Sequence, residues 1–216
     1  LTSSETWLPL AQSVPQAVGE TIINWDIVGL IVEPRPKRVY PEGDMAAHIL
    51  GFVNSNGNGF YGVEGYYDAM LKGRPGLQVG ERSPFGELIP LGASRFVPPT
   101  TGATLYLTVD RNIQKLIENE LRSAVIQYGA QRGSIVVTNP KTGALLGMAS
   151  YPSYDPNNYS ASPEYLFADP NVSEQYEPGS VFKIVTMAAG LDAGEVGPQG
   201  TIYDGGSIEV GGRVIY

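Results

Sequence analysis

The stretch LYLTVDRNIQKLIENELRSAVIQYG, Leu105 to Gly129, is the most informative part of the sequence for the fold class. Apolar and polar residues alternate over residues 105–109, which predicts a strand with one buried face. Asp110 is a favoured N-cap residue and Gly129 is the usual residue after a helix, so together they bound a predicted helix at 110–128. The positions that repeat with the spacing of one helix face are Ile113, Leu116, Ile117, Leu121, Ala124 and Val125.

Two β-hairpins are predicted on the C-terminal side of this helix. SIVVTNPKTGALLGMAS, Ser134 to Ser150, has two apolar runs around a turn-forming segment, Asn139 to Gly143. Near the end of the chain, Gly211-Gly212 separates two short β-type runs. We therefore predict an α+β protein with an antiparallel sheet, and we expect the helix at 110–128 to pack on one face of the first hairpin.

The N-terminal part of the chain has weaker patterns and is rich in loops. We predict a strand at residues 27–34 (IVGLIVEP), a short helix at 44–51 with Asp44 as its N-cap, and a helix at 63–73. Short extended pieces with many glycine and proline residues are expected at 76–99.

The segment FVPPTTG, Phe96 to Gly102, marks the best domain boundary because two prolines and a glycine separate patterned segments there. We therefore expect two domains, residues 1–98 and residues 99–216.

The composition excludes several classes of function. Lys and Arg number 14 and Asp and Glu 22, so the net charge is 14 − 22 = −8, and no basic block is present. Nucleic acid is therefore not an expected partner, because phosphate binding depends on clustered basic residues. The lack of cysteine rules out thiol catalysis, disulfides and cysteine-bound zinc. With one histidine, His48, a histidine-rich metal site is excluded; we expect His48 to be a packing or surface residue, and we expect no cofactor and no metal.

The segment YEPGSVFKIVT, Tyr176 to Thr186, carries the candidate chemistry. It predicts a helix that begins near Pro178 and ends near Gly194, on which Ser180 and Lys183 lie three residues apart and face the same side. The surrounding apolar residues and the positive end of the helix dipole are both expected to lower the pKa of Lys183.

A lysine with a lowered pKa can act as a neutral base that takes the proton of the serine hydroxyl. Ser180 is then the candidate nucleophile, and its backbone N–H, among the unpaired donors of the first helical turn, is a candidate donor to an oxyanion. The alternative reading is a chance match, in which Ser180 and Lys183 are ordinary surface residues and the lysine extends into water.

Two other motif matches are interpreted as structural. Lys141-Thr142-Gly143 spells K-T-G, a motif that accompanies S-x-x-K in penicillin-interacting enzymes, but it precedes the serine and consists of ordinary turn residues. Gly57 to Gly62 spells G-x-G-x-x-G, but no βαβ pattern surrounds it, so a tight turn is favoured over dinucleotide binding.

The ordered set of motifs resembles the class B penicillin-binding proteins, the D,D-transpeptidases that cross-link peptidoglycan. The stretches RVYPEGDMAAHILGFV (38–53) and GFYGVEGYYDAMLKGRPG (59–76) resemble the N-terminal pedestal, or dimerisation, region of that family. The stretches that resemble its transpeptidase domain are LYLTVDRNIQKLIENEL (105–121), GSIVVTNPKTGALLGMASYPSYDPNNY (133–159) and YEPGSVFK (176–183).

This resemblance implies an extended, β-rich pedestal domain at 1–98, followed at 99–216 by an incomplete transpeptidase domain with an antiparallel sheet and flanking helices. It implies that Ser180 is acylated by a D-Ala-D-Ala stem peptide or by a β-lactam, with Lys183 as general base. No S-x-N and no K-T-G follows Lys183, so we expect this chain to be a fragment, inactive by itself.

The resemblance also implies a cellular setting. The family is anchored by an N-terminal membrane segment and works on the extracytoplasmic face of the cytoplasmic membrane, in cell-wall synthesis during growth or division, with other cell-wall synthesis proteins as partners. Such a segment is absent from the sequence. An open edge of an antiparallel sheet favours pairing with another copy, so self-association is a further expectation. A non-catalytic cell-wall scaffold and a penicillin sensor of the same fold are the alternative functions.

Overall fold

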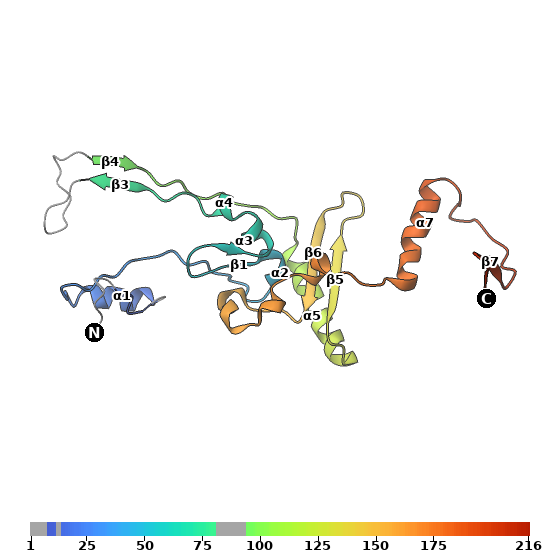
Figure 1. Ribbon diagram of the computed structural model, residues 1–216, viewed down its shortest axis with the longest axis horizontal. Coiled ribbons are helices and arrows are strands. Elements are labelled where there is room, and N and C mark those ends of the chain that lie inside the picture. The colour runs from blue at the N-terminus through green and yellow to red at the C-terminus, as the bar shows by residue number, and fades with distance from the viewer. Residues whose placement is uncertain (1–7, 12–13, 81–93) are drawn as a thin grey trace. The chain divides into compact units, whose positions relative to one another are not determined.

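The structure is a computed structural model that describes residues 8–11, 14–80 and 94–216 (Figure 1). The chain divides into two compact units, with the division after Glu174. The boundary predicted at 98/99 lies inside the first unit and, as a boundary between family domains, it stays a prediction. The extended pieces expected at 76–99 fall partly outside the described residues.

The fold mixes short helices with two-stranded antiparallel sheets, which confirms the predicted α+β class. The helices of the first unit are α1 (Gln16–Ile23), α2 (Ala47–Leu50), α3 (Gly62–Tyr66), α4 (Asp68–Leu71), α5 (Arg111–Tyr128) and α6 (Pro170–Ser173), with the 3-10 helices η1 (Pro156–Ala161) and η2 (Glu164–Leu166). Its strand pairs are β1 (Phe52–Val53) with β2 (Gly59–Phe60), β3 (Leu77–Gly80) with β4 (Ser94–Val97), and β5 (Gly133–Thr138) with β6 (Leu145–Tyr151).

Helix α5 forms as the sequence predicts. The Asp110 carboxylate caps it by accepting hydrogen bonds from the backbone N–H groups of Asn112 and Ile113, at 2.8 and 3.0 Å. Gly129 ends it in the left-handed conformation, with φ 62°.

Helix α5 packs against the hairpin β5–β6, and together they enclose one hydrophobic cluster. The buried members of this cluster are Ile117, Leu121, Val125 and Ala149. The contact is close at Gly147, where an added Cβ would lie 2.9 Å from Ile117 Cδ1. The predicted hairpin and the predicted packing of the helix on it are confirmed.

A second hydrophobic cluster joins residues that are far apart in the sequence. Its buried members are Tyr40, Ala47, Phe52, Tyr154 and Phe167. The Phe52 ring stacks on Tyr159 with the centroids 4.2 Å apart and meets Phe167 edge-on at 4.9 Å. The side chain of Asn157 bridges the backbone N–H and carbonyl of Tyr40, with both hydrogen bonds at 2.9 Å. Residues 40–61 and 154–167 therefore share one core.

A partly buried ion pair supports the same region. Arg38 Nε lies 2.8 Å from Glu64 Oε1, and the Tyr40 hydroxyl donates to the same oxygen at 3.4 Å. The backbone N–H of Val53 donates to the Tyr40 hydroxyl at 2.9 Å. Burial raises the pKa of Tyr40 well above its usual range, with the Glu64 charge adding to the effect, so Tyr40 acts as a neutral linker between these groups.

Three local predictions are wrong. Residues 27–34 and 105–109 form no strand, because neither segment has a partner strand among the described residues to complete its backbone hydrogen bonds. The next residue, Asp110, makes a backbone hydrogen bond to β6, from its N–H to the Leu146 carbonyl at 2.8 Å. Asp44 does not cap α2, because its carboxylate lies 2.7 Å from Arg122 and Ala46 has a left-handed φ of 57°.

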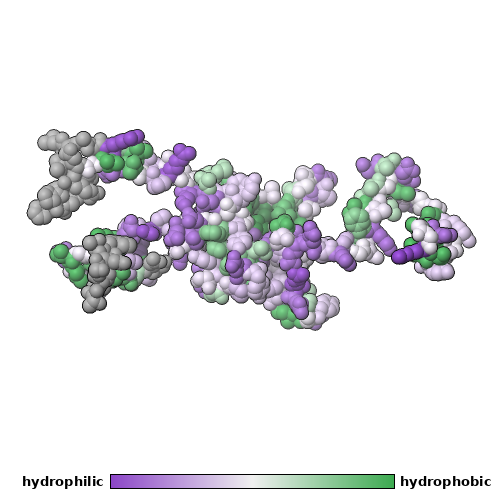
Figure 2. Space-filling model, in the orientation of Figure 1, coloured by the Kyte–Doolittle hydropathy of each residue, from purple (hydrophilic) through white to green (hydrophobic). Residues whose placement is uncertain are grey.

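The second unit contains η3 (Gly179–Phe182), α7 (Lys183–Asp192) and the hairpin β7 (Ile208–Val210) with β8 (Arg213–Ile215). The predicted turn at Gly211-Gly212 is confirmed. Every residue of this unit except Gly190 is exposed, and Figure 2 shows apolar side chains on its surface. No helix in the described part of the chain is both long enough and apolar enough to span a bilayer.

Candidate functional site

The residues of the S-x-x-K motif lie in one continuous helical segment of the second unit. Ser180 belongs to η3, and Lys183 is the first residue of α7. The backbone N–H of Val181 donates to the Pro178 carbonyl at 3.2 Å, which closes the turn that holds Ser180. Gly179 has φ 55°, a conformation that costs most other residues strain, so the backbone beside the serine favours glycine.

The surroundings of this pair are open. Ser180 and Lys183 are both exposed, and the described residues form no hydrogen bond between them. The apolar side chains that were expected to surround the lysine are themselves exposed, at 62% for Val181, 71% for Ile184 and 54% for Val185. The roles of Ser180 as nucleophile and Lys183 as base therefore stay predictions.

The two motif matches that were interpreted as structural occupy turns. Lys141 to Gly143 lie between β5 and β6, where the Asn139 side chain accepts a hydrogen bond from Lys141 N–H at 2.9 Å and Gly143 has φ 74°. Gly57 has φ 75° in the turn of the hairpin β1–β2, and Gly62 begins α3.

His48 is a packing residue, as expected. Its ring is buried, meets Tyr154 edge-on at 5.5 Å, and places Nε2 2.9 Å from the Leu166 carbonyl. Burial lowers the pKa of His48, while the negative charge of Asp169 and the contact with the Leu166 carbonyl oppose that shift. The ring therefore acts as a neutral donor to the carbonyl.

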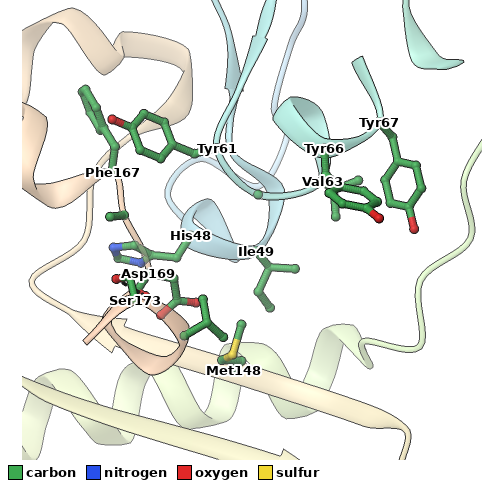
Figure 3. Close-up of a pocket in the computed structure, with 13 residues that line it drawn as sticks. His48, Ile49, Tyr61, Val63, Tyr66, Tyr67, Met148, Phe167, Asp169 and Ser173 are labelled. Atoms are coloured by element: carbon green, nitrogen blue, oxygen red, sulfur yellow. Dashed lines mark hydrogen bonds between the residues drawn. The ribbon is translucent and has the colours of Figure 1, made fainter. Parts of the chain in front are cut away.

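The first unit also contains a cavity that the sequence did not predict. It has a volume of about 430 Å³ and lies between α2, α3, β6 and α6 (Figure 3). Most of its wall is apolar or aromatic, with His48 and Asp169 as its titratable groups other than tyrosine. Asp169 follows the same Asp-Pro-Asn pattern as the exposed Asp155, so no signal in the sequence separates the two.

The described residues contain no group of three or more histidine, aspartate or glutamate side chains arranged to hold a metal ion.

Two family models match the chain in consecutive order. The penicillin-binding protein dimerisation domain matches residues 16–107, and the penicillin-binding protein transpeptidase domain matches residues 133–215. The second match includes Ser180 and Lys183.

Curated relatives and a solved structure agree with these matches. Stage V sporulation protein D of Bacillus subtilis is 36% identical over 97% of this chain and 33% of its own length. The peptidoglycan D,D-transpeptidase FtsI of Escherichia coli is 32% identical over 87% of this chain and 32% of its own length. The crystal structure of penicillin-binding protein 3 from Mycobacterium tuberculosis in complex with aztreonam is similar with a TM-score of 0.65 and 31% identity, over 82% of this chain and 36% of that one. The chain thus spans about a third of the length of the curated relatives it matches.

Proposed function

The chain belongs to the class B penicillin-binding proteins, with their dimerisation domain and part of their transpeptidase domain, and we propose that it is part of a peptidoglycan D,D-transpeptidase. The observation that supports this proposal is the position of YEPGSVFK (176–183) inside a transpeptidase match that directly follows a dimerisation match. We keep residues 1–98 and 99–216 as the proposed extents of these domains.

In the proposed reaction, the Ser180 hydroxyl attacks the carbonyl carbon of the penultimate D-Ala of a stem peptide. The neutral amine of Lys183 accepts the hydroxyl proton and passes it to the nitrogen of the terminal D-Ala, which leaves as the peptide bond breaks. The backbone N–H of Ser180 donates to the oxyanion that forms on the way. An amine of a neighbouring strand then attacks the ester carbonyl carbon and forms the crosslink. The proton lost by this amine passes through Lys183 to the departing Ser180 oxygen, which restores the serine hydroxyl.

A β-lactam would enter the same reaction as a substrate analogue. Attack of Ser180 on the lactam carbonyl opens the ring, and the former amide nitrogen stays attached to the acyl group, so no leaving group departs. The bound aztreonam of the M. tuberculosis relative is consistent with a β-lactam site in this family.

The proposed place of action is the extracytoplasmic face of the cytoplasmic membrane, where the stem peptides lie. A membrane anchor and contacts with other cell-wall synthesis proteins are part of this proposal, because they follow from the family resemblance.

The test is acylation of the full-length protein by a fluorescent penicillin, followed by mass spectrometry of the labelled peptide. We expect the label on Ser180 and its loss in Ser180→Ala, while Ser160→Ala, a change at an exposed serine in η1, leaves labelling intact. A label that survives Ser180→Ala would contradict the site assignment. A full-length protein that takes no label at all would favour the alternative of a non-catalytic scaffold.

A further inference from the structure

The cavity of the first unit holds a carboxylate whose hydrogen bonds are unevenly distributed. Asp169 is only 7% exposed. Its Oδ1 atom accepts hydrogen bonds from the Ser150 hydroxyl at 2.9 Å and from the Asn171 backbone and side chain at 3.0 and 2.9 Å. Its Oδ2 atom is buried and accepts none from the described residues. A buried carboxylate oxygen without a donor is unfavourable, because desolvation removes water and nothing replaces it.

The charge of Asp169 is also unbalanced within the cavity. Among the residues that the structure describes, no lysine or arginine lines the cavity. His48 lies beside Asp169 (Figure 3), but it donates through Nε2 to the Leu166 carbonyl and burial favours its neutral form. The polar groups that reach Asp169 are the neutral donors of Ser150 and Asn171. The wall therefore presents a net negative charge to whatever occupies the cavity.

The rest of the wall has the properties of a site for an apolar group. Tyr61, Tyr66, Tyr67 and Phe167 present aromatic surface, and Figure 3 shows Ile49 and Met148 along the same space. A volume of about 430 Å³ lies within the range of small-molecule sites. Such a wall suits the apolar body of an organic ligand, and the carboxylate is the polar group that can fix its orientation.

We propose that this cavity binds a small organic cation, with its ammonium group directed at Asp169 and its apolar body against the aromatic wall. The ammonium group would supply the donor that Oδ2 lacks and the positive charge that the wall lacks. An anion would be repelled by the Asp169 carboxylate, and a purely apolar ligand would leave Oδ2 without a hydrogen-bond donor.

Entry of the cation requires a small local rearrangement. Oδ2 is buried, so the surrounding structure must shift before the donor of a ligand reaches it. Val172 and Ser173 follow Asp169 in α6 and line the cavity, and Val172 is 77% exposed. Because both residues are exposed, a rearrangement there disturbs the buried core least.

His48 gives a direct readout, because it lines the cavity and is the single histidine of the chain. The experiment titrates the protein with phenethylamine, an aromatic ammonium ion near neutral pH, at constant pH while the Cε1–H signal of the His48 ring is followed by NMR. The same titration with phenethyl alcohol supplies a neutral ligand of nearly equal shape. We expect a saturable shift with the amine and affinity for the alcohol weaker by about tenfold or more, as a charge-assisted hydrogen bond implies.

A matched pair of variants tests whether the Asp169 carboxylate is the charge that binds the amine. Asp169→Asn keeps an acceptor for Ser150 and Asn171 but removes the negative charge, so the preference for the amine should be lost. Asp155→Asn alters the equivalent carboxylate of the other Asp-Pro-Asn segment, which caps η1 outside the cavity, and should keep the preference.

Three outcomes would overturn the proposal: equal affinities for amine and alcohol, no saturable His48 shift with the amine, or an undiminished preference in Asp169→Asn. The first two comparisons use the unmodified protein, so they stand even if Asp169→Asn fails to fold.

Discussion

Lys183 follows Ser180 by three residues. In the proposed acylation step, its amine accepts the proton of the Ser180 hydroxyl and passes it to the leaving nitrogen. Lys183→Met keeps the length of the side chain and removes the base, so we predict that acylation of the full-length protein by a fluorescent penicillin slows by about 10²–10⁴-fold. The initial rate of labelling measures this effect. Lys141→Met, in the turn between β5 and β6, is the matched control and should label at the normal rate. Equal losses in the two variants would contradict a specific role for Lys183.

At His48 the prediction concerns stability and pH. Because burial lowers the pKa of the folded-state ring, the unfolded chain binds a proton first as the pH falls. The contribution of His48 is therefore fully present above the unfolded pKa of about 6.5 and is lost as the pH falls from there through the lowered folded value. The nearby Asp169 charge opposes this loss without reversing it.

The measurement compares urea midpoints of the wild type and His48→Gln at about pH 7.5 and about pH 5.5, on either side of the unfolded pKa. We expect the wild type to lose more stability than the variant between these two values. The same loss in both proteins would show that other groups carry the pH dependence.

At the scale of elements, Gln114 joins α5 to β6. It is 1% exposed; its side chain accepts from Met148 N–H at 2.9 Å and donates to the Met148 carbonyl at 2.7 Å. Gln114→Leu would leave two partly buried backbone groups of Met148 unpaired, and we predict a loss of about 2–4 kcal/mol in the free energy of unfolding. Denaturant unfolding measures it, with the exposed helix residue Gln127→Leu as the control, expected to change by less than about 0.5 kcal/mol. Similar losses in both variants would contradict this reading.

Elements with local signals could be predicted from the sequence, and elements that depend on distant partners could not. Asp110 and Gly129 bound α5 through contacts within their own helix, so sequence spacing was sufficient. Asp44 has the same capping chemistry but pairs with Arg122, which lies 78 residues away in the sequence. Residues 27–34 and 105–109 have strand composition, yet a strand forms only where a partner completes its hydrogen bonds.

The candidate sites follow the same rule. The S-x-x-K motif is contained within four residues and could be recognised directly. The cavity combines α2 and α3 with β6 and α6, and its key carboxylate, Asp169, looks like Asp155 in sequence. Only tertiary packing buries one and exposes the other.

At the scale of the whole molecule, we predict that residues 40–61 and 154–167 unfold together, because they share the aromatic cluster. Phe52 contacts both segments, so Phe52→Ala should lower the free energy of unfolding by about 3–5 kcal/mol. It should also speed amide hydrogen exchange over 154–167, although the mutation lies some hundred residues earlier in the chain. Phe96→Ala, at a 66% exposed position of β4, is the control and should leave that exchange unchanged. If Phe52→Ala leaves the exchange over 154–167 unchanged, the two segments unfold independently and the prediction is wrong.

The second unit should behave differently from the first when this 216-residue chain is studied alone. Helix α7 has 10 residues and none of them is buried, whereas α5 has 18 residues and buries one face. Isolated helices of fewer than about 12–15 residues are marginal in water, so α7 amides should exchange far faster than α5 amides in hydrogen–deuterium exchange. Because Lys183 begins α7, a frayed helix would hold the serine and its base together only briefly, and labelling of this chain by penicillin should be weak. Protection of α7 equal to that of α5, together with rapid labelling, would show that these residues alone build a competent site.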